Sequence, residues 1–151
     1  MLDSANKLLE EMKDIEYCEF TRLMSPLEVV VTRKGSCHDQ VMYEMEELHE
    51  LCLNPKAKFI LAVDKDNNGL ETHSFVYYED GDRVCWFENA WKDNRGINKF
   101  LCEKDMFDRI ESLFKHRTNA SNLYFVDFNP DEHTIGEDIH TLVDICTDHN
   151  L

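Results

Sequence analysis

The sequence lacks a long apolar run, a basic and apolar signal pattern at its N-terminus, and any excess of positive charge. Crossing a bilayer takes about 18 or more apolar residues in a row, and no stretch of the chain comes near that length. Its 16 basic residues stand against 31 acidic ones, a net charge of −15. Binding to a nucleic-acid backbone needs the opposite sign. We therefore expect a soluble, cytoplasmic protein with neither a membrane nor a nucleic acid as its partner.

The six cysteines follow no pattern typical of a metal site or a disulfide framework. They stand at positions 18, 37, 52, 85, 102 and 146, with no CxxC pair and no regular spacing. A zinc ribbon needs thiols paired at short, fixed spacing, and small disulfide-rich domains are typical of oxidising compartments. We therefore expect reduced thiols, in keeping with a cytoplasmic protein, and neither a metal nor a cofactor.

One acidic stretch, DKDNNG at 64–69, matches the first half of an EF-hand calcium loop. The last position of such a loop must supply a bidentate glutamate, and Phe75 stands there instead. The stretch also falls between predicted strands rather than between helices. We predict a polar turn at this place and no calcium site.

The chain has an excess of negative charge, which allows two interpretations of its surface. A decoy for a nucleic-acid-binding protein would imitate phosphate charge, but it would gain from excluding the Lys and Arg residues found throughout this chain. A solvated acidic surface is the commoner explanation, and it weakly favours basic partners. The length of 151 residues fits a single domain, 1–151, without internal repeats or long linkers.

A basic, glycine-containing turn brings a cysteine to the start of a helical pattern, in the segment GSCHDQ at 35–40. Apolar residues then recur at helical spacing: Val41, Met45, Leu48 and Cys52. We therefore predict an amphipathic helix over about 36–51. Extending the apolar stripe back by one turn places Cys37 on the packed face, where a free cysteine is often only a small buried hydrophobe.

The position of Cys37 also suits a nucleophile. With Ser36 as N-cap, Cys37 lies in the first turn, where unpaired N–H groups and the helix dipole favour a thiolate. Arg33 and Lys34 add positive charge nearby. A lowered thiol pKa is what a cysteine nucleophile needs near neutral pH. Neighbours on a helix point about 100° apart, so we expect His38 to face solvent or the rim of a cleft.

Two runs rich in aromatic and β-branched residues, 72–78 and 83–88, predict a β-hairpin. If the Asp-Gly pair at 80–81 forms a two-residue type I′ loop, His73 lies directly opposite Glu88. Opposed residues have Cβ atoms about 4.5–5.5 Å apart, so a carboxylate there can orient an imidazole. A longer loop would shift this register. Together with the helix-start cysteine, these residues supply the parts of a catalytic triad.

These segments resemble the transglutaminase-like superfamily, and more narrowly its small bacterial and phage members. The resemblance is carried by GSCHDQ before a helix, THSF at 72–75, and WFENAW at 86–91 with Arg-Gly-Ile at 95–97. It covers roughly residues 25–100 of this chain. It implies an α+β fold with a papain-like core, in which a cysteine-bearing helix packs against an antiparallel sheet that presents the histidine and the acid.

Carried over by position, the resemblance implies Cys37 as the nucleophile, His73 as the base and Glu88 as the third member. Many relatives place an aspartate slightly further past the tryptophan, whereas here Asn89 is the next polar residue. Asn89 is therefore the alternative orienter of His73, as an asparagine is in papain-like enzymes.

Asn89, Trp91 and Gln40 are the candidates for substrate binding, although Trp91 can also cap the core and Gln40 the helix start. The expected chemistry is acyl transfer: the cysteine attacks an amide or ester carbonyl, and water or an amine releases the acyl-enzyme. We favour a cysteine hydrolase, a protease or amidase, with a peptide or protein substrate. The alternatives are a catalytically silent binding module of the same fold and the acidic decoy.

The hydrophobic pattern also predicts the remaining elements. We expect helices over 3–13, 104–115 and 134–148, strands over 57–63 and 122–128, and a strand or extended segment over 27–32. Residues 90–100 are expected to form a loop beside the site.

Overall fold

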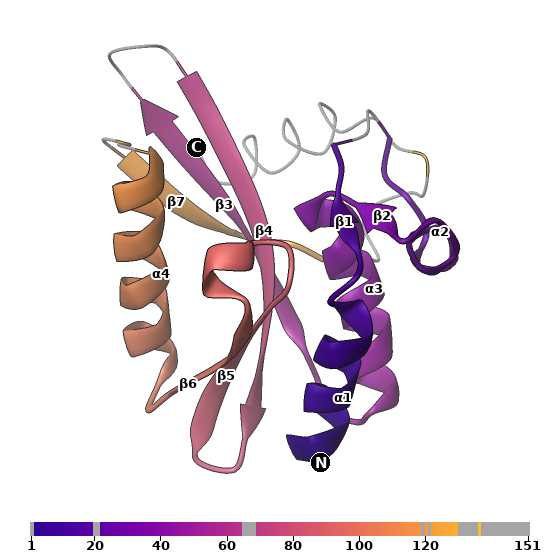
Figure 1. Cartoon of the computed structure of the whole chain (residues 1–151). Helices are drawn as coiled ribbons and strands as arrows, with labels where there is room; N and C mark the ends of the chain where they lie inside the picture. Colours follow the sequence, from indigo (N-terminus) through magenta and orange to yellow (C-terminus); the bar gives the residue numbers. More distant parts are fainter. Residues whose placement is uncertain are drawn as a thin grey trace.

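The computed structural model describes residues 2–19, 22–64, 69–118, 120, 122–129 and 136. At its centre is a five-stranded antiparallel sheet with strand order β6-β5-β4-β3-β7 (Figure 1). The strands are β3 (Lys56–Asp64), β4 (Gly69–Asp80), β5 (Arg83–Glu88), β6 (Gly96–Phe100) and β7 (Asn122–Asp127). A separate ladder pairs β1 (Glu16–Tyr17) in parallel with β2 (Lys34–Gly35).

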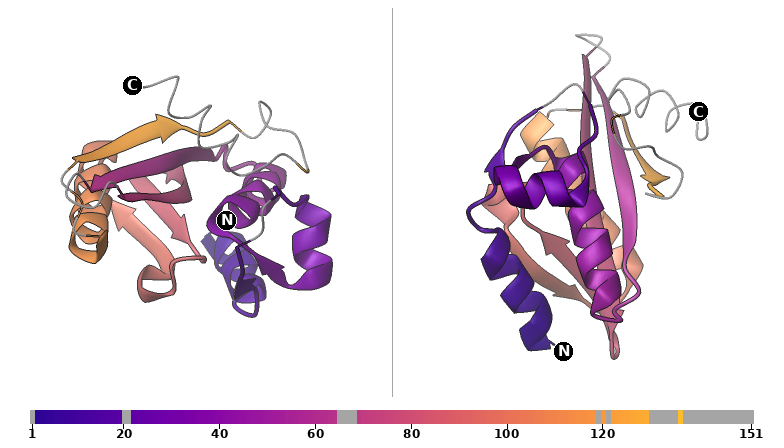
Figure 2. Two further views of the ribbon diagram at one scale, coloured as in Figure 1. Left: turned by 90° about the horizontal axis from the view of Figure 1, so that it is seen from above. Right: turned by 90° about the vertical axis from the view of Figure 1, so that its right-hand side faces the viewer.

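Helices cover both faces of this sheet (Figures 1 and 2). α4 (Glu103–Thr118) lies on one side, and α1 (Leu2–Met12), α2 (Pro26–Thr32) and α3 (Cys37–Glu50) group together on the other. α3 carries Cys37 at its first position and packs against β4. The predicted fold class, α+β with a cysteine-bearing helix on an antiparallel sheet, is therefore confirmed. Within the described ranges, none of the helices combines the length and apolar character that a membrane span requires.

Alternating side chains on the strands build two separate cores. Phe59 and Val76 point to the side of α1, α2 and α3, and belong to one cluster of buried residues. Ile60 and Phe75, their neighbours along the chain, belong to the second cluster, with Phe114 of α4. His73 pairs with Ile60 and lies two residues before Phe75, so the register places it on the α4 side of β4.

Most of the predicted elements are present: α1, α3, β3, the β4–β5 hairpin, α4 and β7 match the expected ranges within a few residues. Two predictions are wrong. Residues 27–32 are helical, because Ser25 and Glu28 form a capping box and Pro26 fits the first helical turn. The expected loop at 90–100 contains a 3₁₀ turn, η1 (Lys92–Asn94), and the edge strand β6. The predicted turn at 64–69 and helix at 134–148 fall largely outside the described residues.

The predicted hairpin register is also wrong, by two residues. Asp80 pairs with Arg83 and Tyr77 with Trp86, so the two-residue loop is Gly81-Asp82 rather than Asp80-Gly81. Gly81 has a φ of 63°, and the pattern fits a type II′ turn with glycine at its first central position. Because side chains alternate with a period of two, a shift of two leaves every residue on its predicted face.

The difference in strand length creates space for a site. β4 has 12 residues and β5 has six, and their ladder joins 76–80 to 83–87. The first half of β4, which includes His73, therefore extends past the end of β5. The start of α3 and the chain that follows β5 reach β4 at this place.

Candidate active site

A capping box holds Cys37 at the start of α3. The Ser36 hydroxyl accepts from the Asp39 amide, and an Asp39 oxygen accepts from the Ser36 amide at 2.9 Å. The other oxygen of Asp39, which is fully buried, accepts from the Met24 amide at 2.8 Å. Space at Gly35 is tight, because a Cβ there would lie 3.1 Å from the Asp39 Cβ. These contacts fix the helix start and confirm Ser36 as its N-cap.

His73 and Glu88 form a buried, hydrogen-bonded pair. Nε2 of His73 lies 2.7 Å from Oε1 of Glu88, and the two residues are 3% and 2% exposed. The second carboxylate oxygen accepts from the Trp91 amide at 3.1 Å. In the observed register Glu88 is a diagonal rather than a direct neighbour of His73, a separation that long side chains can span. Both oxygens of the acid have partners, so its position relative to the ring is fixed.

Aromatic contacts fix the plane of the histidine ring. Trp91 meets His73 edge-on with ring centroids 5.5 Å apart, and Phe114 of α4 stacks on it at 6.2 Å. Trp91 is 8% exposed and belongs to the α4-side core. The imidazole therefore has little freedom to turn away from its partners.

The Cys37 thiol lies close enough to His73 for each side chain to change the pKa of the other. Because Nε2 faces Glu88, Nδ1 is the ring nitrogen left for the sulfur. Burial alone would raise the pKa of Cys37, but the charges and hydrogen bonds of His38 and His73 hold it well below its ordinary value. Burial alone would lower the pKa of His73, but the Glu88 charge and hydrogen bonds to Cys37 and Glu88 raise it to about 10. Near neutral pH, these shifts favour a thiolate paired with an imidazolium.

The expectation that His38 faces solvent is wrong. It is 4% exposed, and its ring stacks on Phe59 with centroids 5.3 Å apart. Its Nδ1 lies 2.5 Å from the Ser74 hydroxyl oxygen. The first turn of α3 is surrounded on more than one side, so even the polar neighbour of the cysteine is buried. His38 is a second histidine whose charge and hydrogen bond act on the Cys37 sulfur.

Asn89 and Gln40 are brought together, but they hold the framework and do not contact His73. The Asn89 amide nitrogen donates to Oε1 of Gln40 at 2.8 Å and to the Met12 carbonyl at 3.1 Å, and its oxygen accepts from Arg95 at 2.8 Å. Both side chains are fully buried. This geometry gives no support to a substrate contact by either residue, and the histidine is oriented by the neighbouring acid instead.

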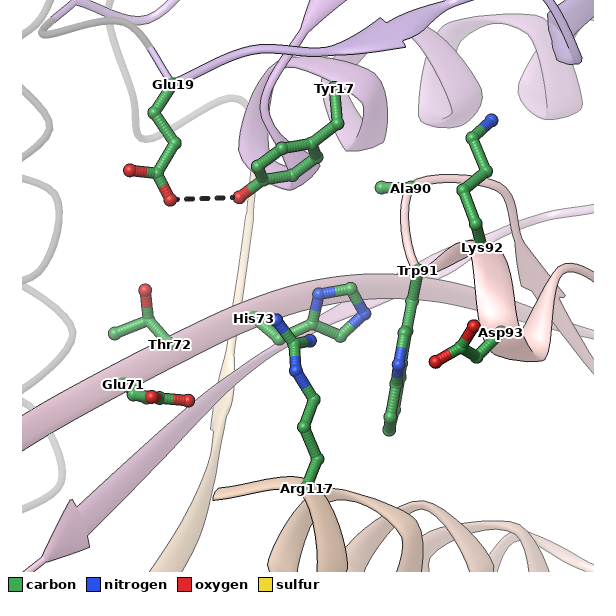
Figure 3. Close-up of a pocket in the computed structure, with 10 residues that line it drawn as sticks. All are labelled: Tyr17, Glu19, Glu71, Thr72, His73, Ala90, Trp91, Lys92, Asp93 and Arg117. Carbon is green, nitrogen blue, oxygen red and sulfur yellow. Dashed lines mark hydrogen bonds between the residues drawn. The ribbon is translucent and has the colours of Figure 1, made fainter.

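A pocket of about 520 Å³ opens beside His73 (Figure 3). Aromatic, acidic and basic side chains surround it: Tyr17, Glu19, Glu71, Thr72, Ala90, Trp91, Lys92, Asp93 and Arg117. The Arg117 guanidinium lies over the Trp91 ring, 5.6 Å from its centroid. Trp91 both lines this pocket and belongs to the α4-side core, so its role as a substrate wall stays a prediction. A molecule in the pocket would meet charges of both signs.

Sequence reasoning missed Tyr17. Its hydroxyl donates to Glu19 at 3.3 Å, and burial and then the charge of Cys37 raise the pKa of Tyr17. Tyr17 lies in a strand of two residues, which is too short to produce a periodic pattern. The sequence therefore held no signal for this contact.

Glu44 was also missed, although the sequence held a signal for it. It lies on α3 two turns after Cys37 and is 2% exposed. Burial, and then the Glu88 charge, raise the pKa of Glu44 well above its ordinary value. An acidic residue between Val41 and Leu48 interrupts the predicted apolar stripe, and this interruption marks a buried carboxyl.

Among the residues that the structure describes, no group of three or more His, Cys, Asp or Glu side chains is arranged to hold a metal ion. The fold and the site define a class by geometry: an α+β domain with a cysteine at a helix start, a strand histidine and a buried acid. No protein-family model matches the sequence, and no curated protein matches it either. The residues of the site are therefore the main indication of function.

Proposed function

We propose that the protein catalyses acyl transfer through Cys37, His73 and Glu88, and that its reaction is hydrolysis of an amide or peptide bond. The observation that carries the proposal is the placement of one buried imidazole between a thiol and a carboxylate, with Nε2 2.7 Å from Glu88. The order of cysteine, histidine and acid on helix, strand and strand also supports the transglutaminase-like assignment.

Each residue has one role in the proposed reaction. The Cys37 thiolate attacks the carbonyl carbon, and the carbonyl π electrons move to oxygen. As the tetrahedral intermediate collapses, the carbon–nitrogen bond breaks and the His73 imidazolium gives its proton to the leaving amine. Water then attacks the thioester while the neutral imidazole takes its proton, and the sulfur leaves as thiolate. Glu88 keeps the ring oriented and stabilises its positive form.

The pocket supports a peptide as the substrate. Its lining combines Trp91, an apolar wall, with carboxylates of Glu19, Glu71 and Asp93. Together with the net charge of −15, these acids favour a basic residue beside the bond that is cleaved. We therefore propose basic peptides as the first substrates to test.

Selective alkylation tests the proposal without knowledge of the substrate. Near neutral pH, iodoacetamide should modify Cys37, although it is buried, faster than the exposed Cys52 and Cys102. Cys85 is a matched buried control, because burial raises its pKa. Peptide mass spectrometry of partly labelled protein gives all the rates in one sample.

A second arm of the experiment ties the reactivity to the histidine. His73→Gln should reduce Cys37 labelling to the rate of an ordinary buried thiol and leave the exposed cysteines unchanged. If wild-type Cys37 reacts no faster than Cys85, the residues do not form an activated site and the enzymatic proposal is wrong. If it reacts quickly, incubation with peptide and ester electrophiles should give a thioester adduct at Cys37.

A further inference from the structure

Tyr17 is held next to the cysteine by the short β1–β2 ladder. It pairs with Gly35, which lies two residues before Cys37. Two backbone hydrogen bonds close the ladder on either side, from Glu16 to Arg33 at 2.9 Å and from the residue after Tyr17 to Gly35 at 3.2 Å. The backbone of Tyr17 is therefore fixed relative to the helix start.

The Tyr17 side chain lines the same pocket as His73, and the two residues lie on facing sides of it in Figure 3. Tyr17 lies close enough to Cys37 for the charge of the sulfur to act on its hydroxyl. The same hydroxyl donates to Glu19 over 3.3 Å, which is longer than the usual 2.5–3.0 Å or so of an O–H···O bond. Glu19 is therefore a weak acceptor for this proton.

We infer that the Tyr17 hydroxyl donates a hydrogen bond to the oxyanion that forms when Cys37 attacks a substrate carbonyl. This inference rests on the proposed acyl transfer. The oxyanion is bonded to the carbon that the sulfur attacks, and Tyr17 and His73 line one pocket (Figure 3), so an oxyanion formed in this pocket is within reach of the Tyr17 hydroxyl. A developing oxyanion is also a stronger acceptor than a distant carboxylate. No atom is transferred, because the hydroxyl keeps its proton throughout.

The remaining donors of this site come from the first turn of α3. The Asp39 amide bonds to the Ser36 hydroxyl at 3.3 Å, and the Gln40 amide bonds to the Ser36 carbonyl at 2.9 Å. The amides of Cys37 and His38 come before the first intrahelical bond of α3, from Gln40 to Ser36, so neither has an acceptor within the helix. An oxyanion beside the sulfur would therefore meet a backbone donor on one side and Tyr17 on the other.

Tyr17 stays a donor across the working pH range. Burial of the ring, and then the charges of Cys37 and Glu19, raise the pKa of Tyr17 above its ordinary value. The phenol therefore stays protonated near neutral pH, where the acylation is measured.

Two reagents that differ in one respect test the role of Tyr17. Iodoacetamide alkylates the thiolate by displacement at a saturated carbon, without an oxyanion, whereas p-nitrophenyl acetate acylates it through a tetrahedral oxyanion. Both rates at Cys37 are measured for wild type and Tyr17→Phe, at the plateau of each pH profile, and the background of the Cys37→Ser variant is subtracted. Loss of one oxyanion donor should slow acylation about 10²-fold and leave alkylation nearly unchanged.

Tyr124→Phe is the matched control, because Tyr124 is partly exposed on β7 outside this pocket, and it should change neither rate. The melting temperature of each variant is measured alongside, since Tyr17→Phe removes only one oxygen from a half-exposed side chain. Equal slowing of acylation and alkylation would assign Tyr17 to thiol activation and overturn the inference, as would no slowing at all. A wild-type Cys37 that resists both reagents would instead overturn the proposed function.

Discussion

His73 lies between an acid and a sulfur, so its charge depends on both residues. Burial opposes a charged imidazole, but the Glu88 charge, the hydrogen bonds to Cys37 and Glu88 and the Cys37 charge together raise its pKa to about 10. The imidazolium in turn helps to lower the pKa of Cys37. A substitution of Glu88 should therefore change the pKa of Cys37, although no contact between the two residues is required.

Replacing Glu88 with Gln should move the pH dependence of Cys37 alkylation to higher pH. The amide keeps the shape of the side chain but removes the charge, so the pKa of His73 falls and the imidazolium supports the thiolate less. In wild type, the rate should rise at a pH well below that of an ordinary thiol and then stay level, because the thiolate is the reactive form above the Cys37 pKa. If the Cys37 pKa rises by one, the thiolate is destabilised by about 1.4 kcal/mol and the rate on the acid side falls about tenfold.

Asn89→Ala is the control for this experiment. It removes hydrogen bonds to Met12, Gln40 and Arg95, so the melting temperature should fall while the inflection pH stays where it is in wild type. The opposite pattern, with the inflection moved by Asn89→Ala and not by Glu88→Gln, would return the orienting role to Asn89.

The sequence allowed the three central residues to be predicted because each had a local signal. Cys37 followed a capping residue at the start of an apolar stripe, and His73 and Glu88 stood on flanking runs of a hairpin. The burial of His38 could not be predicted this way. Helical periodicity identifies the apolar face of a helix, but it does not show whether other parts of the fold bury its remaining faces. Tyr17 depends on a contact between segments that only tertiary packing brings together.

At the scale of elements, two helices begin with the same device in different surroundings. Ser25 and Glu28 cap α2 where the chain is exposed, and Ser36 and Asp39 cap α3 where it is buried beside the sulfur. A comparison of the two caps therefore separates the effect of a cap on helix stability from its effect on the site.

Ser25→Ala and Ser36→Ala should each destabilise the protein by about 1 kcal/mol, or about 2–4 °C in melting temperature for a chain of this size. Only Ser36→Ala should also slow the alkylation of Cys37, because it loosens the first turn that carries the thiolate. Thermal denaturation and peptide mapping of labelled protein give the two quantities. Equal labelling rates in both variants would mean that the cap does not help to position Cys37.

The errors in predicted elements have local causes as well. The run Val-Val-Thr at 30–32 favours a strand by propensity, but the capping box and the proline at the first turn selected a helix. The hairpin loop was placed one residue early because Asp-Gly is the usual type I′ pair. In the structure, glycine is instead the first of the two loop residues. This second error did not affect the predicted His73–Glu88 pair, because a register shift of two residues leaves Glu88 on the same face of the sheet as His73.

At the scale of the whole molecule, two electric fields of opposite sign act at the pocket. The chain carries a net charge of −15, which repels anions from a distance. Lys92, Arg117 and the His73 imidazolium lie in or beside the pocket and attract them at short range. Which field is stronger decides whether basic or acidic peptides suit the site.

Iodoacetate and iodoacetamide separate the two fields, since they react alike but only iodoacetate is charged. We expect the ratio of their rates at Cys37 to be lower than for a free thiol in solution, and to rise with added salt as the Debye length falls from about 30 Å at 0.01 M to about 3 Å at 1 M. The exposed Cys52 and Cys102 report the distant field without the pocket cations. A ratio that falls with salt at Cys37 alone would show that Lys92 and Arg117 dominate, and the proposed preference would then change from basic to acidic peptides.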